Sequence, residues 1–122
     1  MLQKGVLFLL LTVFAASLAP AFAKDLTETE VIAVAKDALT GKAIAFEDAV
    51  VVYDKDNQKW IGWGEVVAKT PSDPNYGNLP QGVLSGKKYH TVYFDFDETK
   101  RDDVWVFVDA DTGDVLSVYE EK

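Results

Sequence analysis

Three aspartates near the C-terminus, Asp109, Asp111 and Asp114, have the residue type and the close spacing that suggest metal chemistry. An EF-hand calcium loop needs oxygen ligands at positions 1, 3 and 5, glycine at position 6 and glutamate at position 12. Counted from Asp109, Gly113 falls at position 5, so the spacing fails. We therefore predict a structural turn formed by Asp109, Thr112 and Gly113, and no metal site.

The chain has one histidine, His90, and 20 acidic residues. Catalysis by a Ser-His-Asp triad needs a positioned serine and an oxyanion hole, and the serines of this chain lie in no recognisable nucleophile motif. A zinc site would need further histidine or cysteine ligands. With so many carboxylates, acidic pairs occur by chance, so such a pair does not by itself indicate glycosidase activity. We expect no catalytic residue and no cofactor, and a structural role for His90.

Aromatic side chains are the best candidates for binding a partner, because tyrosine and tryptophan combine a large apolar area with a polar tip. Several of them occupy odd-numbered positions in predicted strands, where they would share one face of a sheet. The alternative is that these rings form the core, since large aromatic side chains are usually buried. The tentative partner-binding set is Trp63, Tyr76, Tyr89, Tyr93, Trp105 and Phe107.

Length and composition restrict the classes of protein to which this chain can belong. The 122 residues include no cysteine, have a formal net charge of −8 and are 48% hydrophobic. This length allows one domain, and the absence of cysteine excludes disulfides and thiolate metal sites. The acidic balance disfavours binding to nucleic acid, because no basic excess is present to neutralise phosphates.

The first 23 residues have the pattern of a bacterial secretory signal peptide. Lys4 precedes a nearly continuous apolar run over residues 5–18, and the small residues Ala21 and Ala23 frame a cleavage site before Lys24. The apolar run is shorter than the roughly 20 residues that a membrane-spanning helix needs. We therefore expect an exported protein, periplasmic or secreted, with a single domain over residues 24–122 and no membrane association after cleavage.

The hydropathy pattern of residues 24–122 predicts one helix followed by strands. Thr27 and Glu30 have capping-box spacing, and apolar residues then repeat with helical period, so we predict a helix over 27–40. Residues 70–86, with three prolines and three glycines, are predicted to be a long loop. The predicted strands are 49–53, 60–69, 87–96, 103–109 and 114–119.

These elements predict an α+β fold in which the N-terminal helix packs on a curved antiparallel sheet of four to five strands. The third and fourth predicted strands are apolar on both faces, whereas one helix of this length covers only one face. The second face must therefore be covered by the 70–86 loop, by curvature of the sheet or by a partner.

The segment from Val106 to Leu116, VFVDADTGDVL, resembles the closing hairpin of the PepSY domain family. The predicted helix, TETEVIAVAKDAL, is similar to the opening helix of that family. PepSY domains are small α+β modules of bacterial exported proteins, and they occur in the propeptides of secreted metallopeptidases. The resemblance implies a role in binding or inhibiting a peptidase rather than an enzymatic activity.

Two functions remain open from the sequence. The first is a non-enzymatic, PepSY-like exported module that binds a protein partner, a peptidase among the candidates, through the aromatic residues and the 70–86 loop. The second is a periplasmic protein that binds a small ligand or a cation at an aromatic-lined surface. A flat exposed aromatic patch would favour the first function, and a concave pocket with convergent polar groups would favour the second. The oligomeric state stays open.

Overall fold

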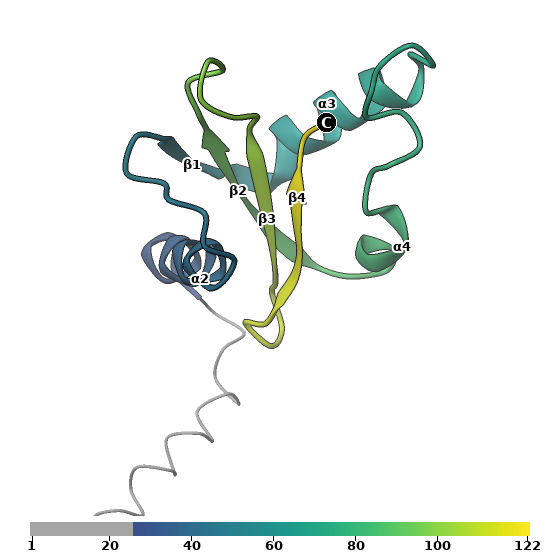
Figure 1. Ribbon diagram of the computed structural model, residues 1–122. Coiled ribbons are helices and arrows are strands. Elements are labelled where there is room, and N and C mark those ends of the chain that lie inside the picture. The colour runs from purple at the N-terminus through teal and green to yellow at the C-terminus, as the bar shows by residue number, and fades with distance from the viewer. Residues whose placement is uncertain (1–25) are drawn as a thin grey trace, which may run out of the picture.

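An open antiparallel sheet of four strands, with its strands in the order β1-β2-β3-β4, forms the middle layer of the protein (Figure 1). The computed structural model describes residues 26–122, so the predicted signal peptide lies outside the described residues. Within this range the fold is α+β, as the sequence predicts. The strands are β1 (Val50–Asp54), β2 (Tyr89–Asp95), β3 (Val104–Asp109) and β4 (Val115–Glu120).

Helix α2 (Glu28–Gly41) precedes the sheet and begins with a complete capping box. The Thr27 hydroxyl accepts a hydrogen bond from the Glu30 amide at 3.2 Å, and the Glu30 carboxylate accepts one from the Thr27 amide at 2.8 Å. Both bonds satisfy N–H groups that the first helical turn leaves without partners. The side chains of Glu28 and Glu30 also place negative charge at the positive end of the helix dipole.

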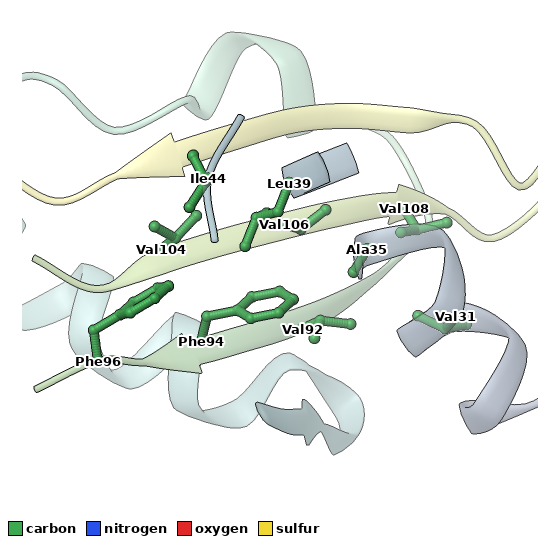
Figure 2. Close-up of a cluster of buried hydrophobic side chains, with 10 residues drawn as sticks. All are labelled: Val31, Ala35, Leu39, Ile44, Val92, Phe94, Phe96, Val104, Val106 and Val108. Atoms are coloured by element: carbon green, nitrogen blue, oxygen red, sulfur yellow. The ribbon is translucent and has the colours of Figure 1, made fainter. Parts of the chain in front are cut away.

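One face of the sheet packs against α2 and forms the first core cluster (Figure 2). Three residues of α2 at helical spacing, Val31, Ala35 and Leu39, are fully buried there. They meet alternate residues of β2 and β3, because side chains on a strand point to the same face at every second position. The strand residues of this cluster are Val92, Phe94, Val104, Val106 and Val108.

The expected strand over 60–69 is wrong, because this segment forms helix α3 (Gln58–Ala68). Trp60, Trp63 and Val67 recur at helical spacing, and Trp60 and Val67 are buried. The Asp54 carboxylate accepts hydrogen bonds from the amides of Lys59 (2.9 Å) and Trp60 (2.8 Å), which caps the first turn of α3. The expectation of a single helix is therefore also wrong.

The connection between α3 and β2 is more ordered than the predicted 70–86 loop. It contains the short helix α4 (Gln81–Leu84), and three backbone turns precede it. In these turns the amides of Asp73, Tyr76 and Asn78 each donate to the carbonyl three residues earlier, at 2.9 Å. The 3-10 helix η2 (Lys55–Asn57) connects β1 to α3.

The second face of the sheet is covered from within the chain. Helices α3 and α4 lie on the opposite side of the sheet from α2 (Figure 1), and they contribute Trp60 and Leu84 to a second buried cluster. The sheet is thus the middle of three layers. No helix within residues 26–122 is long and apolar enough to cross a membrane.

Candidate functional site

The predicted aromatic residues of the strands do share one face, but that face is the core beneath α3. Trp105 and Phe107 are only 2% and 0% exposed, so the expectation that they contact a partner at the surface is wrong. The Trp60 ring lies between them, with ring centroids 5.1 Å from Trp105 and 4.6 Å from Phe107. Trp63 stacks on Trp105 at 5.4 Å. The tryptophans of α3, read as strand residues in the sequence, are therefore what buries this face.

The remaining predicted residues of this face are partly buried at its edges. Tyr89 packs edge-on against Phe107 at 5.7 Å, and Tyr93 lies 4.3 Å from Trp105 between ring centroids. The Lys59 ammonium lies 5.1 Å above the Tyr93 ring, in a cation–π contact. Tyr89 and Tyr93 thus belong to the rim of the second core cluster, and Lys59 covers part of one face of the Tyr93 ring.

The polar groups of two of these rings, Tyr93 and Trp105, donate hydrogen bonds to carboxylates. The Tyr93 hydroxyl donates to the Asp103 carboxylate, and the Trp105 indole donates to the Glu121 carboxylate at 2.8 Å. Burial, the bond to Asp103 and nearby carboxylates raise the pKa of Tyr93. Burial also raises the pKa of Glu121, because the charged form loses hydration, and the charge of Asp103 adds to this effect. The bonds satisfy the polar groups that the aromatic packing buries.

The loop after α3 is anchored to the C-terminus by Asn75. The side-chain oxygen of this residue, which is 5% exposed, accepts hydrogen bonds from the Tyr119 hydroxyl (2.6 Å) and the Lys122 amide (2.7 Å). The Asn75 amide and side-chain nitrogen both donate to the Asp73 carboxylate, at 2.8 and 3.1 Å. This set of bonds anchors the loop backbone next to Tyr76.

Tyr76 lines an open apolar groove between α3 and the following loop. The groove encloses about 300 Å³, and its lining residues are Val67, Ala68, Tyr76, Gly77, Leu79 and Gln81. Leu79 lies beside Gly64 of α3, where an added Cβ atom would make an ordinary van der Waals contact of 3.7 Å with the Leu79 methyl carbon. Tyr76 is 46% exposed although its loop is anchored. An exposed aromatic ring is therefore displayed at the rim of an apolar hollow.

A second hollow of about 240 Å³ continues along α3 on the other side of Ala68 and Gln81, which line both hollows. Its remaining lining residues are Trp60, Ile61, Gly64, Glu65 and Tyr89. Ile61 is an exposed large apolar side chain here, as Tyr76 is in the first hollow. The two hollows together are called the α3 groove below. Of the six predicted partner-binding residues, the α3 groove contains Tyr76 and Tyr89.

His90 is engaged in a structural contact. Its Nδ1 atom and the Tyr53 hydroxyl are joined by a hydrogen bond of 2.8 Å between β2 and β1. Burial lowers the pKa of His90, because the charged imidazolium loses hydration. Burial also raises the pKa of Tyr53, and the carboxylate of Glu28 contributes. Both shifts favour the neutral forms that share this hydrogen bond.

Asp109 organises the hairpin turn between β3 and β4. Its Oδ1 atom accepts hydrogen bonds from the amides of Asp111 (2.7 Å) and Thr112 (3.1 Å), and the Thr112 hydroxyl accepts one from the Asp114 amide at 3.1 Å. Gly113 has a φ of 81°. These residues have the turn roles that the sequence predicts. Within residues 26–122, no group of three or more histidine, cysteine or acidic side chains is arranged to hold a metal ion.

Sequence reasoning missed residues that shape the α3 groove, Asn75 and Val67 among them. Asn75 anchors the loop, and Val67 supplies part of the apolar floor. The helical spacing of Trp60, Trp63 and Val67 was a usable signal for α3, whereas the long-range bonds of Asn75 leave no local pattern. Comparisons of this chain with family models, with curated proteins and with solved structures found no match.

Proposed function

We propose that this protein is a non-enzymatic exported module that binds a protein partner in the α3 groove. The observation that carries the proposal is the position of Tyr76, which is 46% exposed and lines the same hollow as the apolar residues Val67 and Leu79. Exposed aromatic residues beside a pocket are frequent anchors of protein interfaces. The proposed contact is an apolar side chain of the partner inserted beside Tyr76.

The anchoring of the loop supports a binding role. Ordering a flexible loop on binding costs conformational entropy, which lowers affinity. Here Asn75 already connects the loop to Tyr119 and to Lys122, so the backbone that carries Tyr76 is anchored before a partner arrives. An anchored backbone reduces the ordering cost of binding at Tyr76.

The lining of the hollows suits apolar side chains of a partner. The two parts of the α3 groove enclose about 300 and 240 Å³. The lining is largely apolar, with Glu65 and Gln81 as its charged and amide side chains.

A non-enzymatic role agrees with the way the titratable groups are used. His90 is bonded to Tyr53, and the carboxylates of Asp54 and Asp109 accept backbone N–H groups in a helix cap and a turn. Groups occupied in this way hold the fold together.

The proposed partner is a secreted peptidase, and the protein would be PepSY-like. This part of the proposal rests on the VFVDADTGDVL hairpin and on the helix that starts at Thr27. Export rests on the pattern of residues 1–23. To test export, the protein is expressed in a bacterial host and the intact mass of the exported chain is measured by mass spectrometry. A mass that corresponds to a chain starting at Lys24 would support the proposal.

A photo-crosslinking amino acid at position 76 tests the binding proposal. The variant is expressed with export in a bacterium that secretes metallopeptidases, irradiated, and its crosslinked products are identified by mass spectrometry. The matched control carries the same amino acid at Val115, an exposed apolar position on β4 away from the α3 groove. We expect a peptidase to be crosslinked from position 76 and not from position 115.

Binding of that peptidase is then measured with purified proteins. Tyr76→Ala is expected to raise the dissociation constant about tenfold or more, as loss of an interface anchor does, whereas Val115→Ala is expected to leave it unchanged. A crosslink only to a non-peptidase protein would contradict the peptidase assignment but would support the role as a protein-binding module. A crosslink only to a small molecule would support the ligand-binding alternative. No crosslink at position 76 would contradict both.

A further inference from the structure

The chain at the end of β4 ties the last strand to the loop after α3. The segment Tyr119–Lys122 is called the clasp below. Its first and last residues both donate to the side-chain oxygen of Asn75, through the Tyr119 hydroxyl at 2.6 Å and the Lys122 amide at 2.7 Å. Because Asn75 lies in the loop that carries Tyr76, the clasp fixes one wall of the α3 groove.

The half-buried residue Glu121 holds the clasp on β3. Its carboxylate accepts the indole N–H of Trp105 at 2.8 Å, and its backbone amide donates to the carbonyl of Asp103 at 3.0 Å. Glu121 directly precedes Lys122, so a movement of Glu121 away from Trp105 would also shift the Lys122 amide relative to Asn75. The hold on the loop therefore depends on the position of the Glu121 carboxylate.

The charged groups that face Glu121 are mainly acidic. Asp102 and Asp103 precede β3, and Asp73 lies in the loop that the clasp holds. Burial raises the pKa of Glu121 above its usual value of 4.5, and the charges of these three carboxylates add to the effect, although the Trp105 hydrogen bond acts in the opposite direction. A half-buried carboxylate thus stands among like charges.

The basic side chains of this region are engaged elsewhere or exposed. Arg101 pairs with Glu120 at 2.7 Å, and Lys59 lies over an aromatic ring. Lys122 is exposed. Within residues 26–122, the salt bridges do not include Glu121. No basic side chain of the described residues therefore forms an ion pair that would offset the repulsion on an ionised Glu121.

We propose that the clasp is a pH-dependent switch, which holds the loop after α3 firmly when Glu121 is protonated and releases it in part when Glu121 is ionised. A protonated carboxyl keeps an oxygen that accepts the Trp105 indole hydrogen, and it no longer repels the neighbouring carboxylates. An ionised carboxylate regains hydration and moves away from those charges when the clasp opens. The effect on a partner rests on the proposed function of the α3 groove, whereas the switch itself does not.

The direction of the pH dependence follows from these surroundings. In the open clasp the Glu121 carboxyl is hydrated and has its usual pKa of 4.5, and in the closed clasp its pKa is higher. The closed form therefore has its full stability below about pH 4.5 and loses this contribution as the pH rises through the pKa of the closed form. Acidification thus fixes the loop, and neutral pH loosens it.

The experiment is hydrogen exchange between pH 4.5 and 7.5 on the protein purified from an exporting host. Protection factors, which correct for the intrinsic pH dependence of exchange, are compared for the Lys122 amide and for the amides of residues 71–80. We expect them to fall about fivefold toward pH 7.5, the size of effect that a partly exposed charge interaction produces. Protection factors in α2 are not expected to fall. The side-chain carboxyl carbon of Glu121 is titrated by NMR in parallel, and its midpoint is expected to match that of the loop.

Two neighbouring glutamates provide the test variant and its matched control. Glu121→Gln keeps an acceptor for Trp105 and removes the charge, so we expect high protection of residues 71–80 at every pH. Glu120→Gln removes the same charge from an exposed position and is expected to keep the wild-type pH dependence. Wild-type protection of the loop that does not change with pH would overturn the proposal. The wild-type pH dependence in Glu121→Gln would overturn it too.

The NMR titration keeps the proposal falsifiable if Glu121→Gln fails to fold, because a loop midpoint that differs from the Glu121 midpoint in the wild type would overturn it. The exchange measurement needs no partner, and Tyr76→Ala is expected to leave the pH dependence of the clasp unchanged. Failure of the switch and failure of the proposed function are therefore distinguishable.

The link between the clasp and the α3 groove is tested with the peptidase that is crosslinked from position 76. Between pH 5 and pH 7.5 we expect the wild type to lose about fivefold in affinity beyond any loss shown by Glu121→Gln, because a loosened loop must be ordered on binding. The variant removes the titrating group of the clasp and leaves those of the peptidase in place. An equal loss for the two proteins would contradict the link.

Discussion

The side-chain oxygen of Asn75 accepts a hydrogen bond of 2.6 Å from the hydroxyl of Tyr119, which lies 44 residues further along the chain. The same oxygen accepts the amide of Lys122. One buried amide thus connects the loop that carries Tyr76 to the last strand. The shape of the α3 groove depends on this contact, because the loop forms one of its walls.

Replacement of Asn75 by alanine is expected to lower the free energy of unfolding by about 1–3 kcal/mol, because the buried Tyr119 hydroxyl loses its acceptor. Asn78→Ala is the matched control, since Asn78 is exposed and its side chain donates to the nearby Pro74 carbonyl. Chemical denaturation measures both variants, and hydrogen exchange of residues 71–80 reports release of the loop. Equal stability of the two variants would contradict the anchoring role.

Asp54 is expected to be essential for the start of α3. Asp54→Ala removes the acceptor of the Lys59 and Trp60 amides, and we expect a loss of about 1–2 kcal/mol in the free energy of unfolding. Glu65→Ala, an exposed change within the same helix, is expected to stay within about 0.5 kcal/mol of the wild type. Near-ultraviolet circular dichroism should show loosened tryptophan packing for Asp54→Ala alone. Identical spectra for both variants would refute the cap.

Two glycine substitutions are expected to act in opposite directions. Gly113→Val should destabilise the protein by about 1–3 kcal/mol, because a β-branched residue is strained at a φ of 81°. Gly62→Ala should stabilise it by about 0.5–1 kcal/mol, because Gly62 lies within α3 and an added Cβ would meet no atom within 4 Å. Thermal denaturation measures both. Gly113→Val with wild-type stability would contradict the turn assignment, and destabilisation by Gly62→Ala would contradict the helical assignment of this segment.

The His90–Tyr53 contact predicts a pH dependence of stability. The folded state lowers the pKa of His90, so below about pH 6.5 the unfolded chain binds a proton more readily than the folded one. The contribution of His90 to the free energy of unfolding should therefore be fully present above pH 6.5 and should be lost as the pH falls toward the pKa of the folded state. Glu121, whose pKa is raised by burial, acts with the opposite sign at lower pH. His90→Gln isolates the histidine, and a variant with the wild-type slope between pH 5 and 8 would disprove its role.

Tyrosine ionisation is expected to unfold the protein at high pH. Burial raises the pKa of four tyrosines above the usual value of 10, namely Tyr53, Tyr89, Tyr93 and Tyr119. Above about pH 10 the unfolded chain loses these protons more readily, so stability is full below that pH and decreases above it. Tyr93→Phe removes one of the four groups and should make the decrease shallower. Alkaline unfolding curves test this, and parallel curves for the two proteins would contradict it.

Local interactions explain what the sequence by itself determined. Within the turn from Asp109 to Gly113, the bonds of Asp109, Asp111, Thr112 and Gly113 join residues at most five apart, and the Thr27–Glu30 capping box spans three. Such short-range contacts leave a readable spacing in the sequence. The alternation of β2 and β3 is likewise local, so the sequence predicted both strands within two residues of their observed ends.

Only the tertiary structure decided what covers the second face of the sheet. The segment of Trp60 and Trp63 carries two glycines and several β-branched residues, which made a strand as plausible as a helix. It is helical because Asp54 caps its first turn and because Trp60 buries itself against Trp105 and Phe107. The contacts of Trp60 with Trp105 and Phe107 join residues more than 40 positions apart, and no local spacing encodes them. They turned the predicted aromatic surface into a core and left the α3 groove outside it.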